Sequence, residues 1–77
     1  MLLNMVQDEL VAMKISELML DIGERLDASI LMAMENGSPQ EFNEYRAIVG
    51  RLMGAILLEI LNPLYSQLPS LKPPELA

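Results

Sequence analysis

The sequence predicts an all-α protein, an antiparallel helical hairpin that assembles into a larger helical bundle. Apolar residues recur every three or four positions along two long stretches, neither stretch contains an internal proline, and a strong turn signal separates them. The predicted helices cover residues 5–35 and 39–61, and residues 63–77 are expected to form an extended, proline-rich docking tail. With 77 residues, the chain has room for a single domain, 1–77.

The turn signal lies between the two predicted helices. Gly37 can end the first helix in the left-handed conformation, and Ser38 can cap the second. Pro39 then takes the first helical position, and the carboxylate of Glu41 at the third can reach back to the amide of the cap residue. Such a short loop places two helices side by side in opposite directions.

The predicted end of the second helix depends on Pro63. A proline lacks the amide hydrogen and clashes with the preceding helical turn, so we expect this helix to end near Leu61. Three further prolines predict an extended tail, and its leucines could cover the start of the first helix in the same chain or in a neighbouring one. The leucines of this tail are Leu64, Leu68, Leu71 and Leu76.

Each predicted helix has an apolar stripe that is expected to form the seam of the hairpin. The stripe of the first helix comprises Val11, Ile15, Leu18, Ile22, Leu26, Ile30 and Ala33. That of the second comprises Phe42, Tyr45, Val49, Leu52, Ile56 and Ile60. A second strip on the first helix comprises Leu2, Met5, Met13, Leu20, Leu31 and Met34. Because one partner helix cannot cover both strips, the second strip predicts contacts with other chains, or methionines that fill gaps in an ordinary core.

The second helix adds further candidates for an interface. Its last turns are apolar on nearly every side and contribute Leu57, Leu58 and Leu61. Gly50 and Gly54 form a flat groove that another helix could approach closely, unless the two glycines are chance drift. Arg51 has no acidic residue three or four positions away, so we expect it to pair with an acid on the first helix or on a partner chain, with ligand binding as the alternative.

Composition argues against catalysis. The chain contains no histidine and no cysteine, which removes the usual general base, the commonest metal ligand and any disulfide framework. Glu17, Asp21 and Glu24 share a helix face and could in principle hold a divalent cation, but a solvated face explains them better. We therefore expect no enzyme, no catalytic residue, no cofactor and no bound metal.

Charge limits the partners. Eleven acidic and five basic residues give a net charge of −6, which disfavours nucleic acids and anionic membrane surfaces. The most apolar stretch, residues 47–61, contains Arg51 and Glu59 and is shorter than the roughly twenty apolar residues of a membrane span. The expected protein is soluble and cytoplasmic, and it binds itself, as a homodimer or higher oligomer, or a larger protein.

Residues 35–54 resemble a pattern in short helical proteins of tailed bacteriophages. The pattern consists of a glycine turn, an aromatic residue, a Tyr-Arg pair and two glycines four positions apart, here Gly37, Phe42, Tyr45, Arg46, Gly50 and Gly54. The resemblance implies a role in virion structure and assembly, in the cytoplasm of a bacterial host or within the phage particle.

Two functions follow as hypotheses. In the first, the chain is a structural or assembly protein that associates with itself and docks on larger proteins. In the second, it is a small acidic protein that inhibits or adapts a host enzyme. Both hypotheses assign the function to contact rather than to chemistry.

Overall fold

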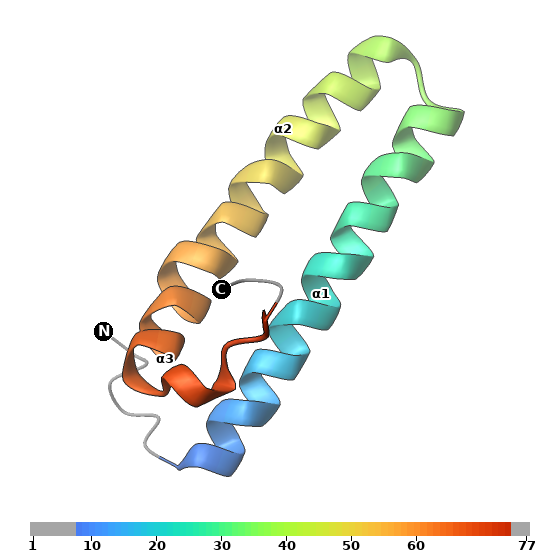
Figure 1. Ribbon diagram of the computed structural model, residues 1–77. Coiled ribbons are helices and arrows are strands. Elements are labelled where there is room, and N and C mark those ends of the chain that lie inside the picture. The colour runs from blue at the N-terminus through green and yellow to red at the C-terminus, as the bar shows by residue number, and fades with distance from the viewer. Residues whose placement is uncertain (1–7, 75–77) are drawn as a thin grey trace.

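The computed structural model describes residues 8–74 and confirms an all-α protein (Figure 1). No strand occurs between residues 8 and 74. The elements are the α-helices α1 (Glu9–Asn36) and α2 (Pro39–Ala55), the π-helical segment η2 (Ile56–Leu61), the short α-helix α3 (Asn62–Gln67) and the 3₁₀ turn η3 (Pro69–Leu71).

The first helix begins at a carboxylate cap. Asp8 has an extended backbone, and its Oδ1 accepts hydrogen bonds from the amides of Leu10 at 2.9 Å and Val11 at 3.2 Å. These amides have no acceptor within the helix, and a negative charge is favourable at a helix N-terminus. Because of this cap, α1 begins at Glu9, whereas the predicted start at residue 5 lies outside the described residues.

The capping box predicted for the turn is present. The hydroxyl of Ser38 accepts from the amide of Glu41 at 3.2 Å, and the carboxylate of Glu41 accepts from the amide of Ser38 at 2.8 Å. These hydrogen bonds lower the pKa of Glu41, the bond from the Ser38 backbone most of all. The turn therefore supplies acceptors for two amides that the first turn of α2 leaves free.

The expected left-handed conformation of Gly37 is wrong. Its φ is −102° and its ψ is 172°, which any residue can adopt. Glycine is required here by a close approach instead, because a Cβ at this position would lie 2.9 Å from the carbonyl oxygen of Ala33. The amide of Gly37 donates a 2.9 Å hydrogen bond to that same oxygen and ends α1.

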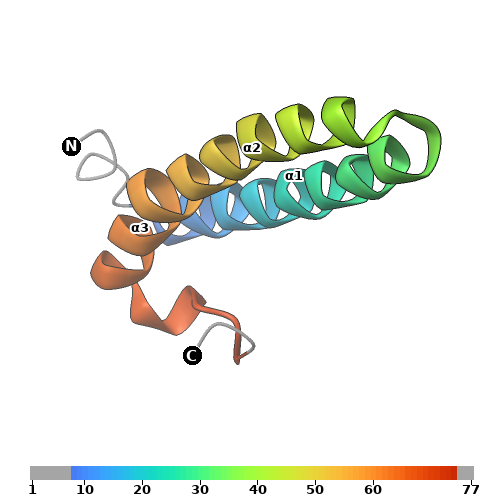
Figure 2. The ribbon, with the colours of Figure 1, turned by 90° about the horizontal axis from the view of Figure 1, so that it is seen from above.

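After this turn, α2 runs back alongside α1 (Figures 1 and 2). The molecule measures 44 by 22 by 20 Å. Two helices in contact form one layer, so each must expose a large part of its circumference unless another element covers it.

The helical path does not end at Leu61, and this corrects the predicted boundary. At η2 the hydrogen-bond pattern widens, so the amide of Asn62 donates to the carbonyl of Leu57, five residues earlier. Pro63 then lies in the first turn of α3, directly after the π turn. The wider π turn accommodates a proline that would clash with an ordinary α-helix.

The tail is therefore helical in its first part and folds against its own chain. Leu64 packs against Ala12 of α1, and both are completely buried. Ile15, Ile60, Leu68 and Leu71 pack around this pair. In Figure 2 the tail projects to one side of the layer formed by α1 and α2, which we call the tail side, and the opposite side is the far side.

The capping box generates a prediction about acid stability. Because the folded-state pKa of Glu41 is lowered, its contribution to stability is present above the unfolded pKa and is lost as the pH falls through the folded pKa. Thermal unfolding followed by circular dichroism from about pH 3 to pH 7 should show a smaller loss of stability in acid for Glu41→Gln than for the wild type.

Glu44→Gln is the matched control, since Glu44 is exposed on the same helix and its carboxylate accepts a bond only from the Gln40 side chain. An identical pH dependence for the wild type and Glu41→Gln would contradict the assignment. Ser38→Ala should cost about 1 kcal/mol near neutral pH.

Candidate interaction surface

The chain buries little of its apolar content. Five apolar residues within residues 8–74 are buried: Ala12, Val49, Leu61, Leu64 and Tyr65. Twelve large apolar residues in the same range are exposed: Leu10, Val11, Met13, Leu18, Leu31, Met32, Met34, Tyr45, Ile48, Leu52, Leu57 and Leu58. The accessible surface is 5624 Å², whereas a compact monomer of this mass exposes about 4,700 Å².

The second strip predicted on the first helix is only partly covered. Met13, Leu31 and Met34 are exposed. Leu20 is half-buried and lines a groove between α1 and α2. Leu2 and Met5, the other two members, lie outside the described residues.

The tail leucines between residues 61 and 71 pack within their own chain, which is one of the two alternatives left open for the tail. Leu61 and Leu64 are buried, and Leu68 and Leu71 are half-buried against the same cluster. These side chains contact other residues of the same chain because the tail turns back onto α1. Leu57 and Leu58, by contrast, remain exposed.

The seam of the hairpin also differs from the predicted stripe. Val11, Leu18 and Leu52 were expected in the seam, but about half of each side chain is exposed. On α1 the buried positions are Ala12 and Ser16. Small residues are buried there because the tail approaches α1 closely at these positions, and a search for large apolar residues overlooks them.

Two serine–tyrosine hydrogen bonds connect α1 to the rest of the chain. The hydroxyls of Ser16 and Tyr65 are hydrogen-bonded, and both residues are buried. The hydroxyl of Ser29 donates to the carbonyl of Leu26 at 2.6 Å, so at its 2.7 Å contact with Tyr45 the tyrosine must be the donor. The only signal in the sequence is a pair of serines, Ser16 and Ser29, beside the apolar stripe of the first helix, and a serine by itself identifies no partner.

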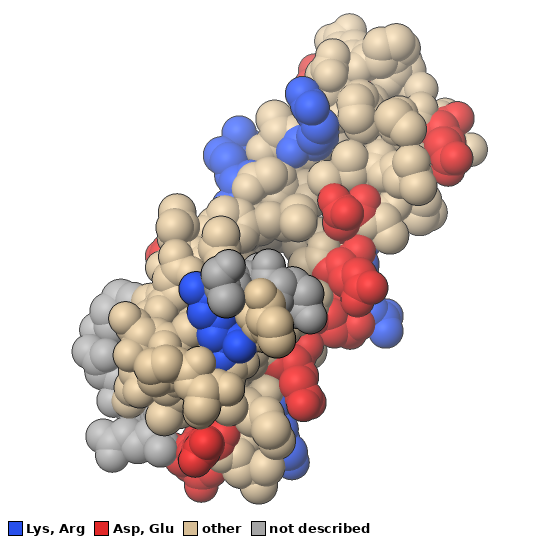
Figure 3. Space-filling view, viewed as in Figure 1, with Lys and Arg blue, Asp and Glu red and all other residues tan. Residues whose placement is uncertain are grey.

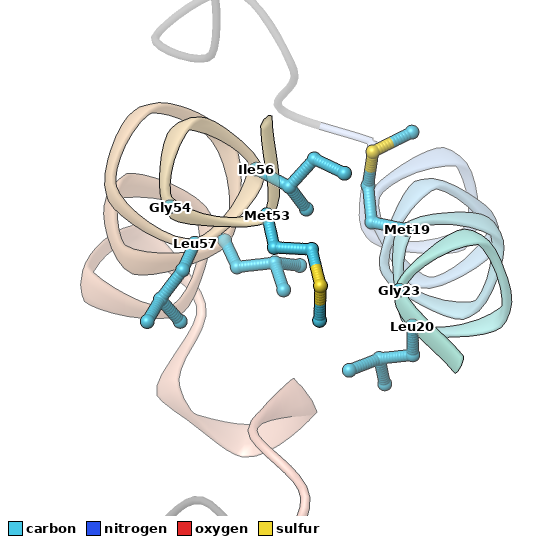
Figure 4. A pocket seen from close by; sticks show the side chains of 8 residues that line it. Met19, Leu20, Gly23, Met53, Gly54, Ile56 and Leu57 are labelled. Carbon is cyan, nitrogen blue, oxygen red and sulfur yellow. The ribbon is translucent and has the colours of Figure 1, made fainter. Parts of the chain in front are cut away.

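An apolar groove of about 370 Å³ opens between α1 and α2. It is lined by Met19, Leu20, Gly23, Met53, Gly54, Ile56, Leu57 and Leu61. In Figure 4 the side chains of Leu20, Met53 and Leu57 point toward the tail side. Ile56, Leu57 and Leu61 come from the π-helical segment, which therefore shapes one wall of the groove.

The glycines of α2 are not in close contact within the chain. A Cβ added at Gly50 or Gly54 would meet no atom within 4 Å, and the same holds for Gly23 on α1. Close packing of these glycines against a helix therefore remains a prediction about a partner chain. Within this chain, Gly23 and Gly54 leave space that forms part of the groove.

Acidic side chains gather along α1 on the tail side (Figure 3). This helix holds six of the eleven acidic residues: Glu9, Glu17, Asp21, Glu24, Asp27 and Glu35. Between residues 8 and 74, no group of three carboxylates is placed to hold a metal ion. The acids of α1 form an exposed row along the helix.

Few of the basic residues form ion pairs within the described part of the chain. Arg25 and Asp21, four residues apart on α1, form an ion pair at 3.1 Å, but both side chains are largely exposed. Arg46 lies over the ring of Phe42, 5.6 Å from its centroid. Arg51 forms no salt bridge with any residue between 8 and 74, so the expected partner on α1 is not found there.

The continuous helical path from Pro39 to Gln67 is long and apolar enough to cross a membrane by length and composition. Its most apolar window has a mean hydropathy of 1.6, and 17% of that window is buried. Helices at protein interfaces can have the same composition. The expected absence of membrane contact is therefore a question for experiment.

The buried hydroxyl pair generates a prediction about stability. Tyr65→Phe removes one partner and leaves the Ser16 hydroxyl buried, which should lower the free energy of unfolding by about 1–3 kcal/mol. Tyr45→Phe is the control and should cost less, because its hydrogen bond is exposed. Urea unfolding measures both effects, and equal costs would contradict the role given to the buried pair.

The glycines generate a second prediction. Gly50→Ala and Gly54→Ala should each stabilise the folded chain by up to about 1 kcal/mol, because alanine favours the helix and the added Cβ meets nothing. Gly37→Ala should destabilise it, because the Cβ would clash with the Ala33 carbonyl. If a partner helix packs against Gly50 and Gly54, the same alanines will weaken self-association measured by sedimentation.

Comparison with known proteins finds no relative of this chain. No protein family matches this sequence, and neither a curated protein nor a solved structure is significantly similar to it. The resemblance of residues 35–54 to short phage proteins therefore remains a prediction. What the chain does must be argued from its surface.

Proposed function

We propose that this chain is a non-enzymatic assembly protein, an antiparallel helical hairpin that associates with itself into a helical bundle and docks on larger proteins. The observation that supports this most directly is the set of twelve exposed large apolar residues, which occurs on both long helices. Water-exposed apolar area of this extent favours association, because burial removes it from solvent at roughly 25 cal/mol per Å².

The surface that this chain exposes beyond that of a compact monomer is large enough for an interface with a second copy. The accessible surface exceeds that of a compact monomer by an amount on the order of 900 Å². A stable protein interface buries about 800 Å² per partner. Two-helix chains commonly bury such exposed apolar surface by pairing into four-helix bundles. Two-fold symmetry is the commonest arrangement of identical chains.

The phage resemblance gives this function a biological setting. A small protein of the virion-assembly region would act in the cytoplasm of a bacterial host or as a component of the particle. The exposed strip residues Met13, Leu31 and Met34, together with Leu57 and Leu58, supply surface for larger partners after self-association.

A second function, that of an acidic inhibitor or adaptor of a host enzyme, is favoured by one observation. The acidic row on α1 is exposed along the tail side and could face a basic surface (Figure 3). In this case the chain would be monomeric when isolated and would lose binding as salt is raised.

Sedimentation velocity over roughly a hundredfold range of protein concentration tests the proposal. We expect the mass to rise from monomer to dimer or a higher oligomer, with a thermal midpoint that also increases with concentration. A chain that stays monomeric at every concentration contradicts self-association. Co-sedimentation with neutral vesicles then separates a membrane-inserted helix, which binds, from a soluble adaptor, which does not.

A further inference from the structure

The far side of α1 and α2 carries an apolar surface that the tail leaves uncovered. We define this far face by three residues from each helix: Val11, Leu18 and Ile22 of α1, and Tyr45, Ile48 and Leu52 of α2. Five of the six are exposed, and Ile22 is half-buried.

Helix geometry places these residues away from the tail. Each residue of an α-helix turns by about 100°. Leu20 points to the tail side in Figure 4, so Leu18 on α1 is rotated about 160° from it. Met53 also points to the tail side, and Ile48 on α2 is rotated about 140° from it, whereas Leu52 and Tyr45 are rotated about 100° and 80° and form the inner edge of the face.

The two rows form one continuous surface. Val11, Leu18 and Ile22 are spaced seven and four residues apart, and Ser29 follows in the same row after seven more. Tyr45, Ile48 and Leu52 form the second row, with spacings of three and four, and because α2 runs back from the Ser29–Tyr45 contact, this row lies beside the Ile22 to Ser29 part of the first. The hydrogen bond between Ser29 and Tyr45 joins the rows directly at one end of the face.

We propose that the far face is the contact surface of a two-fold symmetric dimer of this chain, an inference that rests on the proposed self-association. Two antiparallel helices presented to a second copy of themselves form a four-helix bundle. The row from Val11 to Ser29 covers about 27 Å of helix, at 1.5 Å per residue, on a molecule about 20 Å wide, so this face supplies a large part of the roughly 800 Å² that one partner buries in a standard interface.

Charge favours a second copy in this orientation. The six residues of the face are uncharged, and the exposed charges that flank them are of both signs: Lys14 and Arg25 on α1, with Arg25 paired to Asp21, and Glu44, Arg51 and Glu59 on the α2 and η2 path. The acidic row of α1 lies on the opposite, tail side (Figure 3). Joining two chains through their far faces holds these rows apart, whereas joining them through their tail sides would bring like charges together at a net charge of −6 per chain.

Charged substitutions at matched positions test the face. Leu18 and Leu31 are both leucines of α1, with side chains 53% and 51% exposed, but only Leu18 belongs to the far face. Ile48 and Leu58, at 55% and 65%, form a second pair in the α2 and η2 path. Leu18→Glu and Ile48→Glu should raise the dimer dissociation constant roughly a hundredfold, because each dimer would bury two unpaired carboxylates.

Leu31→Glu and Leu58→Glu should leave dimerisation within a few-fold of the wild type. Sedimentation equilibrium measures all four variants, and helical content by circular dichroism verifies that each one folds. If the two control variants dissociate the dimer and the far-face variants do not, self-association stands and the far face is the wrong surface. A wild-type chain that is monomeric throughout overturns both proposals.

A cysteine experiment avoids buried charge altogether, because the natural chain has no cysteine. In Leu52→Cys the rate of thiol modification should fall at least about tenfold as protein concentration rises through the dimer transition. In Leu31→Cys the rate should stay constant. A concentration-independent rate at Leu52→Cys, in a chain shown to dimerise, would exclude the far face as the contact surface.

Discussion

The contact between Leu64 and Ala12 organises the rest of this structure. Both residues are completely buried, and the hydrogen bond between Ser16 and Tyr65 lies beside them. Together they hold α3 against the first turns of α1. A small side chain on α1 is needed at this point, since a larger one would keep Leu64 at a distance. The position of the tail, and hence the difference between the two sides of the hairpin, depends on this one contact.

The π-helical segment makes that contact reachable. The wider turn at η2 accommodates Pro63, so the helical path continues and carries Leu64 and Tyr65 to α1. The same segment contributes Ile56, Leu57 and Leu61 to the apolar groove. The π turn that accommodates Pro63 therefore also shapes the apolar groove. Single π turns within α-helices frequently occur at functional sites.

The tail divides the molecule into two unlike sides. One side carries the tail and the acidic row of α1 (Figures 2 and 3), and the other carries the far face with exposed Leu18 and Ile48. A chain with this asymmetry can use one side for its own copies and keep the other for different partners.

The sequence by itself determined the all-α class, the capping box at Ser38 and Glu41, and the ion pair of Asp21 with Arg25, because each depends on residues close together in the chain. Only the tertiary structure decided which apolar residues are buried. Helical periodicity marks an arc wider than one contact, so Leu18 and Ala12 could both have been core. The rotation of the helices and the packing of the tail against α1 bury Ala12 and leave Leu18 exposed to water.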